Sequence, residues 1–252
     1  DAPHRDPFAR RSTHDDMTRP ILTDLHGEAL DEALGRCFSL ATETVDVGGR
    51  AVTLVKPENA DHLISEADYV LDERLPYWAD LWPSARVLSA TMAREAGAGR
   101  RLLEMGCGLG LATVGAMLGG FDVTATDYYE DALHVTRGNA ARNLGHEPIV
   151  RMVNWREWPT DLGVFDVVMA ADVLYEKEYA ILVGECMARS LAPDGVAMVA
   201  DPGRLALPMF RDNLMHVGLE IFDTVTTKFE EGPVKQEIQV MRLRHRPIEG
   251  QR

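Results

Sequence analysis

The sequence predicts an α/β fold: a doubly wound, mostly parallel sheet of seven strands with an antiparallel last strand, plus an N-terminal β-hairpin and helices. Short apolar segments alternate with longer helix-compatible segments between residues 101 and 217. Such alternation requires right-handed crossovers and a parallel sheet. A glycine-rich turn joins the first strand of this series to its first helix. The last two segments, residues 219–226 and 236–242, alternate like an antiparallel strand pair.

The chain is expected to divide into three parts. Residues 1–19 are charged and lack apolar periodicity, which predicts a flexible tail. The chain does not begin with methionine, and Met17 offers a natural start, in which case residues 1–16 are an extension. Residues 20–98 are expected to form N-terminal helices and a hairpin packed on the core. Residues 99–246 are expected to form the core itself.

The N-terminal part shows two local patterns. Apolar residues between Ile21 and Cys37 follow the spacing of an amphipathic helix or a pair of turns. Residues 42–55 predict a β-hairpin, in which Gly48 and Gly49 supply a two-residue turn with positive φ. We expect this hairpin at the edge of the main domain, where it either covers the sheet or contributes to substrate recognition.

Two further helices are expected before the core. Residues 61–71 and 85–96 are helix-compatible, and Pro83 suits the first turn of the second helix. Between them, residues 75–84 hold three aromatic side chains and two prolines. Tryptophan side chains often just anchor a segment to the core, so this stretch has a structural reading as well as a functional one.

The most informative stretch is a strand, a glycine-rich turn, a helix and a second strand. Residues 101–105 have the length of a buried strand, and residues 109–118 continue as an apolar helix. Three glycines at alternate positions make the turn: Gly106, Gly108 and Gly110. A ligand can lie against such a turn, facing the free N–H groups of the helix N-terminus. The second strand, residues 121–126, ends on Asp127, which is well placed to accept hydrogen bonds from ribose hydroxyls.

Details of this turn discriminate between nucleotides. A dinucleotide fingerprint needs a third glycine where this chain has Leu111, and the glycine falls one residue early, at Gly110. The chain has no Gly-Lys-Ser/Thr, so the turn is not a Walker-type phosphate loop. A carboxylate at Glu104 would repel a pyrophosphate and suit a ligand with an ammonium and a sulfonium, which is S-adenosylmethionine. An ordinary structural turn, or a nicotinamide or flavin site, remains as an alternative.

The remaining elements continue the alternation. Strands are expected at residues 148–153, 165–171 and 196–200, helices at 128–143, 178–191 and 209–217, and a turn at 193–195. Five residues then fall at the carboxyl ends of successive strands: Glu104, Asp127, Trp155, Asp172 and Asp201. Because ligands bind beyond these ends in a parallel sheet, we expect these residues to surround one site.

Composition excludes several function classes. The net charge of −14 argues against general nucleic-acid binding, which needs a basic face. Three scattered cysteines are too few for a disulfide framework, which indicates a reducing compartment and a cytoplasmic location. The histidines lack metal-ligand spacing, so no metal is expected. The sequence has neither an apolar run of about 18 residues nor the apolar core of a signal peptide, so no membrane association is expected. It does not specify an oligomeric state.

The assembled motifs resemble the class I, seven-stranded S-adenosylmethionine-dependent methyltransferases, and among them the lysine-methyltransferase-like methyltransferase family sixteen. The resemblance covers roughly residues 42–242. Residues 77–84 resemble the segment before that family's motif I, and residues 104–110 resemble motif I. Asn154-Trp155 resembles an Asp-Trp pair, with an amide in place of the acid, and residues 172–175 resemble an acid-x-x-aromatic motif. The resemblance implies a Rossmann-like fold and S-adenosylmethionine as cofactor, with S-adenosylhomocysteine as product.

The resemblance also implies residue roles. The expected cofactor-binding residues are Trp82, Glu104, Gly106, Gly108, Gly110, Asp127, Tyr128, Asn154, Trp155 and Ala171. Among them, Glu104 would face the cationic end of the cofactor and Trp82 would cap its methionine end. Asp127 would hold the ribose hydroxyls. Asp172 and Tyr175 would line the mouth where the acceptor nitrogen arrives, as the catalytic residues.

The implied chemistry is an in-line displacement at the methyl carbon, in which alignment supplies much of the rate. A lysine acceptor must first lose a proton, and Asp172 could then orient its lone pair. The structural alternatives are that Asp172 caps the next helix and that Tyr175 only packs. Asp201 and Arg204 are expected to be turn residues rather than catalytic ones.

The leading functional prediction is N-methylation of a protein lysine side chain. A small-molecule N- or O-methyltransferase is the first alternative. A non-catalytic binding module that has kept the fold is the second. An RNA methyltransferase is opposed by the acidic charge and by the absence of an Asn-Pro-Pro-Tyr motif.

Overall fold

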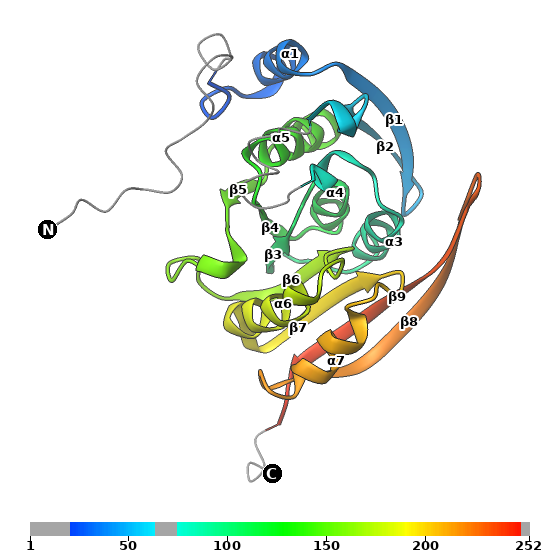
Figure 1. The fold of residues 1–252 in the computed structure, drawn as a ribbon. Helices are drawn as coiled ribbons and strands as arrows, with labels where there is room; N and C mark the ends of the chain where they lie inside the picture. The colour runs from blue at the N-terminus through cyan, green and yellow to red at the C-terminus, as the bar shows by residue number, and fades with distance from the viewer. Residues whose placement is uncertain (1–20, 64–74, 248–252) are drawn as a thin grey trace, which may run out of the picture.

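The computed structural model describes residues 21–63 and 75–247 (Figure 1). Seven strands form one sheet: β3 (Arg101–Met105), β4 (Asp122–Asp127), β5 (Ile149–Met152), β6 (Phe165–Ala171), β7 (Leu191–Asp201), β8 (Leu219–Glu231) and β9 (Val234–His245). The helices are α1 (Gly27–Cys37), α3 (Pro83–Met92), α4 (Leu111–Leu118), α5 (Glu130–Leu144), α6 (Lys177–Ser190) and α7 (Leu207–Leu214). Short 3₁₀ helices are η1 (Ala60–Leu63), η2 (Tyr77–Ala79) and η3 (Trp155–Glu157).

The order of the strands in the sheet is β5-β4-β3-β6-β7-β9-β8. The pairs from β5 to β7 are parallel, and β9 runs antiparallel to both of its neighbours. The predicted mostly parallel sheet with an antiparallel last strand is therefore confirmed. The chain leaves β3 in one direction to β4 and β5, and returns on the other side as β6 and β7. Such a reversal of strand order opens a crevice beyond the carboxyl ends of β3 and β6.

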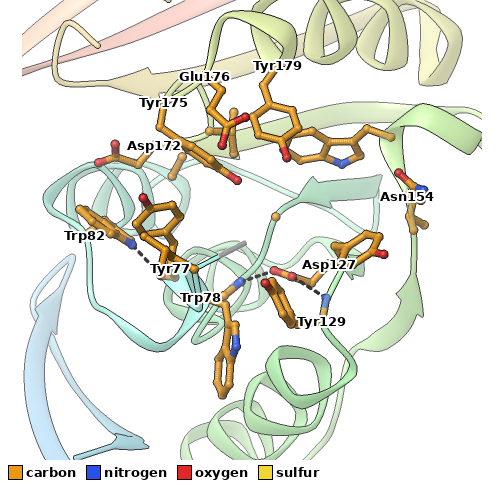
Figure 2. A pocket seen from close by; sticks show the side chains of 18 of the residues that line it. Tyr77, Trp78, Trp82, Asp127, Tyr129, Asn154, Asp172, Tyr175, Glu176 and Tyr179 are labelled. Atoms are coloured by element: carbon orange, nitrogen blue, oxygen red, sulfur yellow. Dashed lines mark hydrogen bonds between the residues drawn. The ribbon is translucent and has the colours of Figure 1, made fainter. Parts of the chain in front are cut away.

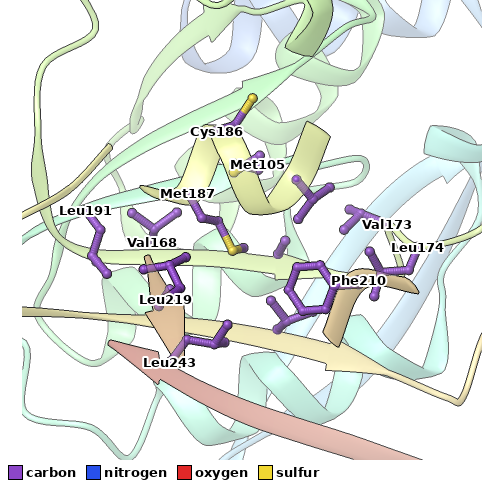
Figure 3. Packing of buried hydrophobic residues seen from close by; sticks show 14 of the residues in the cluster. Met105, Val168, Val173, Leu174, Cys186, Met187, Leu191, Phe210, Leu219 and Leu243 are labelled. Carbon is purple, nitrogen blue, oxygen red and sulfur yellow. The ribbon is translucent and has the colours of Figure 1, made fainter. Parts of the chain in front are cut away.

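Helices cover both faces of the sheet. On one face, α6 and α7 bury the largest apolar cluster, in which Met187 and Phe210 pack against Val168 and Leu243 of the strands (Figure 3). On the other face, α3 and α4 bury side chains such as Leu88 against β3, β4 and β6. Apolar burial of this kind contributes roughly 25 cal/mol per Å² and is the main force that holds the layers together.

The N-terminal hairpin forms its own two-stranded sheet from β1 (Leu40–Val47) and β2 (Arg50–Pro57), with the predicted glycine turn between them. Its apolar face packs on α4 and α5, where Val52 and Leu54 join Val114 and Ala140. The hairpin thus covers helices, and the expectation that it covers the sheet is wrong. The reason is that α4 and α5 already occupy that face of the sheet, so the hairpin adds a third layer (Figure 1).

Several element boundaries differ from the predictions. Helix α1 begins only at Gly27, and of the helix predicted at residues 61–71 the described part is the short η1, while the rest lies outside the described residues. The turn predicted at residues 193–195 lies within the bounds of β7. The pairing with β6 passes there from Leu191 opposite Phe165 to Val196 opposite Val167, so residues 192–195 bulge out of the ladder. Both strands of the final hairpin extend beyond their predicted ends.

Candidate active site

The glycine turn after β3 has the backbone that the sequence predicts. Gly106 and Gly110 have φ values of +73° and +78°, in the left-handed region that favours glycine. The N–H groups of Gly106 and Cys107 both donate to Thr126 O at 2.9 Å, which ties the turn to β4. A Cβ built on Gly110 would lie 2.9 Å from the Cα of Thr136, so a side chain there would push α5 away.

Asp127 lies at the end of β4 and connects the glycine turn after β3 to the loop before α5. Its Oδ2 accepts a hydrogen bond from Gly108 N at 3.0 Å, and its Oδ1 accepts one from Tyr129 N at 3.0 Å. Burial raises the pKa of this carboxyl, while the backbone hydrogen bonds act to lower it. Each oxygen keeps a further lone pair for a ligand hydroxyl, so the side chain can hold the turn and bind a ligand together.

A pocket of about 910 Å³, including space open to solvent, lies over this turn (Figure 2). Ten of the twelve residues predicted for the site line it: Trp82, Gly106, Gly108, Asp127, Tyr128, Asn154, Trp155, Ala171, Asp172 and Tyr175. Glu104 and Gly110 do not line it. The pocket therefore gathers residues from strand ends that are far apart in the sequence.

Glu104 is buried behind the turn. Thr113 Oγ1 of α4 donates a hydrogen bond to its carboxyl group. Desolvation raises the pKa of Glu104 to about 8 against the opposing effect of this hydrogen bond, and the nearby Asp127 raises it further. Glu104 is therefore harder to ionise than a free glutamate, and it lies behind the turn instead of lining the pocket.

A continuous series of aromatic rings lines one wall of the pocket (Figure 2). Tyr175 lies between Tyr77 and Tyr179, with ring centroids at 5.2 and 5.1 Å, and Tyr179 meets Trp155 at 5.4 Å. All of these contacts are edge-to-face, the arrangement that aromatic pairs favour. Sequence reasoning gave no role to Tyr77 or Tyr179. The signal that could have found Tyr179 is its place four residues after Tyr175, in the first turn of the helix that follows the strand-end acid.

Asn154 begins η3, and its Oδ1 accepts a hydrogen bond from Arg156 N at 3.1 Å. This capping bond holds the loop that carries Trp155 into the pocket. Arg156 in turn bonds Glu178 of α6 through two nitrogens, at 2.9 and 2.8 Å. The amide at position 154 thus has a structural function, and its side chain still reaches the pocket.

Asp172 follows β6 with φ of +59°, a conformation that few residues other than glycine adopt. Its carboxyl group is almost fully buried, and Oδ1 accepts a hydrogen bond from Arg204 Nε at 2.6 Å. Its Oδ2 is buried and has no hydrogen-bond partner. The N-cap residue of α6 is Glu176, so Asp172 does not cap that helix.

Arg204 is the functional neighbour that sequence reasoning missed. The predicted turn is present, because Asp201 Oδ1 accepts hydrogen bonds from Gly203 N and Arg204 N at 2.7 and 2.8 Å. The Arg204 side chain, however, leaves the turn to bind Asp172, and its guanidinium lies over the Trp82 ring at 5.1 Å. Arg204 thereby contacts two residues of the pocket wall.

Comparison with known proteins identifies the family. The family model described as lysine methyltransferase matches residues 77–204, half of the chain. The chain belongs to the lysine methyltransferase family. The matched range begins at η2, includes the glycine turn, and ends at Arg204, so it contains the whole described pocket except Leu75.

Individual relatives agree with this family. An electron transfer flavoprotein beta subunit lysine methyltransferase from Xenopus laevis is 31% identical over 133 residues, covering 51% of this chain and 53% of the relative. A ribosomal protein L11 methyltransferase from Pseudomonas aeruginosa is 29% identical over 163 residues, covering 63% of this chain and 50% of the relative. The chain therefore spans about half the length of these curated relatives.

Solved structures confirm the fold. The N-methyltransferase NodS from Bradyrhizobium japonicum, in complex with S-adenosylhomocysteine, matches with a TM-score of 0.52 and 18% identity over 73% of this chain and 95% of that one. The seven-stranded class I methyltransferase fold implied by the sequence motifs is thus confirmed. Within the described part of the chain, no helix is long and apolar enough to cross a membrane, and no cluster of three potential metal ligands occurs.

Proposed function

We propose that this lysine methyltransferase family member transfers a methyl group from S-adenosylmethionine to the ε-nitrogen of a lysine in a protein. The observation that carries the proposal is one pocket lined by the glycine turn and Asp127 in one part and by Asp172 and Tyr175 in another, with a buried, unpartnered oxygen on Asp172. The part of the pocket at the glycine turn and Asp127 suits a nucleoside. The part at Asp172 suits a nitrogen that can donate a hydrogen bond.

The residues present fit the cofactor. A Cβ built on Gly106 would lie 3.2 Å from Val173 and 3.5 Å from Trp155, so only glycine leaves this floor open to a ligand. Asp127 keeps lone pairs for the ribose hydroxyls, and the aromatic ring of Tyr128 or Trp155 suits the adenine. The bound S-adenosylmethionine supplies a methyl group whose C–S bond breaks as an N–C bond forms, with the electron pair left on the sulfur.

Asp172 and the aromatic wall act on the acceptor. A lysine amine has an unperturbed pKa of about 10.4, so it reaches the site as an ammonium. Partial desolvation against the rings of Tyr77 and Tyr175 disfavours this charged form and promotes loss of the proton to solvent. Asp172 Oδ2 accepts a hydrogen bond from the neutral amine and points its lone pair toward the methyl carbon. After transfer the nitrogen carries the positive charge, so charge and atoms balance.

The rim of the pocket favours a protein acceptor over a small molecule. Tyr77 and Tyr175 are each 39% exposed, and Glu176 at the same rim is exposed to solvent. An open, acidic rim suits an extended side chain presented on a basic surface, since opposite charges steer the approach of a partner. A closed pocket would have suited a small substrate better.

Two experiments test the proposal in sequence. Calorimetric titration with S-adenosylhomocysteine should show binding, and the same titration with NAD should not. Incubation with radiolabelled S-adenosylmethionine and an extract of soluble proteins, followed by mass spectrometry, should then locate the label on lysine. Binding without transfer to any amine would favour the non-catalytic binding module, and label on another residue type would overturn the lysine assignment.

A further inference from the structure

Arg204 holds one particular oxygen of Asp172. Its Nε donates a hydrogen bond to Oδ1 at 2.6 Å. Its guanidinium carbon also lies 5.1 Å from the centroid of the Trp82 ring, which helps to hold the side chain in place. The backbone of Arg204 is fixed as well, because its N–H donates to the fully buried Asp201 at 2.8 Å. Two contacts therefore fix the Arg204 side chain and a third fixes its backbone. Arg204 occupies Oδ1 of Asp172, while Oδ2 of the same carboxylate is buried without a partner.

We propose that Arg204 is a positioning residue for methyl transfer: it presents Asp172 Oδ2 to the acceptor nitrogen, and its fixed positive charge disfavours the ammonium form of that nitrogen. This inference rests on the function proposed above. It adds a residue that favours the neutral form of the acceptor amine. Asp172 alone would favour the ammonium form, which has no lone pair for methyl transfer.

The reason lies in the charges around Asp172, which lines the pocket. Asp172 and Asp201 are two buried acids at the ends of neighbouring strands, and each has one buried oxygen without a partner. Together they would favour a protonated amine against the aromatic wall. The guanidinium of Arg204 is bonded to Asp172, while only its backbone N–H is bonded to Asp201, and its positive charge offsets this effect. Arginine suits the task because its guanidinium stays charged at every working pH and its planar fork stacks on aromatic rings.

Other titratable groups around the site do not replace Arg204. The remaining charged or titratable residues that line the pocket are Tyr77, Asp127, Tyr128, Tyr129, Arg156, Tyr175, Glu176 and Tyr179. Of these, Arg156 is the only cation, and its guanidinium is bonded to Glu178 through two nitrogens. Among the residues that the structure describes, Arg204 is thus the cation in contact with Asp172.

The test compares Arg204→Gln and Arg204→Lys with a matched control. Arg244 of β9 has the same local arrangement, because its Nε bonds Glu220 at 2.8 Å and its guanidinium lies over Phe222 at 5.2 Å. Arg244→Gln therefore removes the same kind of contacts away from the pocket. The acceptor is a peptide around the lysine that mass spectrometry locates, made with lysine or with S-(2-aminoethyl)cysteine, whose amine is less basic. Titration with S-adenosylhomocysteine verifies that each variant keeps a folded cofactor site.

We expect kcat/KM of Arg204→Gln toward the lysine peptide to fall about tenfold or more at pH 7, because the rise of the rate with pH moves up by about one pH unit. Arg204→Lys should keep the wild-type pH profile at a lower rate, and Arg244→Gln should match the wild type. The less basic peptide should recover most of the loss in Arg204→Gln. An unmoved pH profile with equal losses for both peptides would overturn the inference while the proposed function stands. Absence of transfer by the wild type to any amine would overturn both.

Discussion

The carboxylate of Asp127 and the N–H of Gly108 form a hydrogen bond of 3.0 Å that joins the end of β4 to the turn after β3. The other oxygen of the same carboxylate accepts a hydrogen bond from the N–H of Tyr129, the residue just before α5. One side chain therefore holds two loops that line the pocket in a fixed relation. Its proposed role as a ribose ligand therefore depends on the same carboxylate that fixes the backbone of the site.

Asp127→Ala should weaken binding of S-adenosylhomocysteine by at least tenfold. It should also lower the free energy of unfolding by about 1–3 kcal/mol, because two backbone donors lose their acceptor. Calorimetry and urea unfolding measure the two effects. Asp122→Ala, an exposed position at the other end of β4, is the control and should change neither. An unchanged affinity in Asp127→Ala would remove Asp127 from the cofactor site.

Asp172→Asn should abolish methyl transfer, by a factor of about 100 or more, because an amide presents a weaker and differently placed acceptor to the amine. Asparagine tolerates the left-handed backbone of this position, so the fold should survive. Affinity for S-adenosylhomocysteine should stay within about threefold. The exposed Asp212→Asn on α7 serves as the control. Full transfer activity in Asp172→Asn would exclude the proposed role.

Tyr175→Phe and Tyr175→Ala separate the hydroxyl of this residue from its ring. The ring packs between Tyr77 and Tyr179, so Tyr175→Phe should keep the wall and most of the transfer activity. Tyr175→Ala removes both edge-to-face contacts and should raise KM for the acceptor by about tenfold. Steady-state kinetics with the labelled cofactor measure both variants. Equal loss in the two variants would assign the function of Tyr175 to its hydroxyl.

Glu104→Gln should change how stability depends on pH. Burial raises the pKa of Glu104 to about 8 in the folded protein from its ordinary value of 4.5, so the folded state keeps a proton that the unfolded state releases. The wild type therefore loses free energy of unfolding as the pH rises through this interval, and the variant does not. Between pH 5 and pH 8, the stability of Glu104→Gln relative to the wild type should rise by roughly 3 kcal/mol.

Urea unfolding at several pH values checks this effect of Glu104. The exposed Glu28→Gln on α1 should show the pH dependence of the wild type. A stability difference that stays constant between pH 5 and pH 8 would mean that Glu104 is ionised in the folded protein at pH 7.

Asn139→Ala should detach the N-terminal hairpin from α5. The buried Asn139 amide accepts from Val55 N at 2.7 Å and donates to Val55 O at 3.0 Å and to Leu109 O at 2.9 Å. Loss of these bonds should cost about 3 kcal/mol in urea unfolding, since buried backbone groups are left unpaired. Asn213→Ala, whose amide makes one long contact of 3.5 Å, should cost little. Equal effects of the two changes would contradict the role of Asn139 as the hairpin anchor.

Local signals in the sequence were sufficient for the fold and for the cofactor half of the site. The glycine turn and Asp127 were predictable because a strand, a positive-φ turn and a strand-end acid each depend on a few neighbouring residues. The alternation of strands and helices indicated a parallel sheet, in which the carboxyl ends of the strands lie at the same edge. The less accurate parts were element boundaries, such as β7, where a register shift extends the strand across a predicted turn.

Contacts between distant residues required the tertiary structure. Arg204 looked like a turn residue, and only the packing of β6 beside β7 brings its guanidinium to Asp172. The hairpin pattern predicted its strands and turn, but its position on α4 and α5 depends on which apolar surfaces remain uncovered.

The sequence by itself determined an α/β methyltransferase fold with a glycine turn and with acids at two strand ends, Asp127 and Asp172. The tertiary structure decided the burial of Glu104, the partner of Asp172 and the place of the hairpin. Secondary structure and turns follow from the short-range periodicity and backbone preferences of the chain. Ionisation and ion pairing follow instead from burial and from distances between segments, which exist only once the layers have packed.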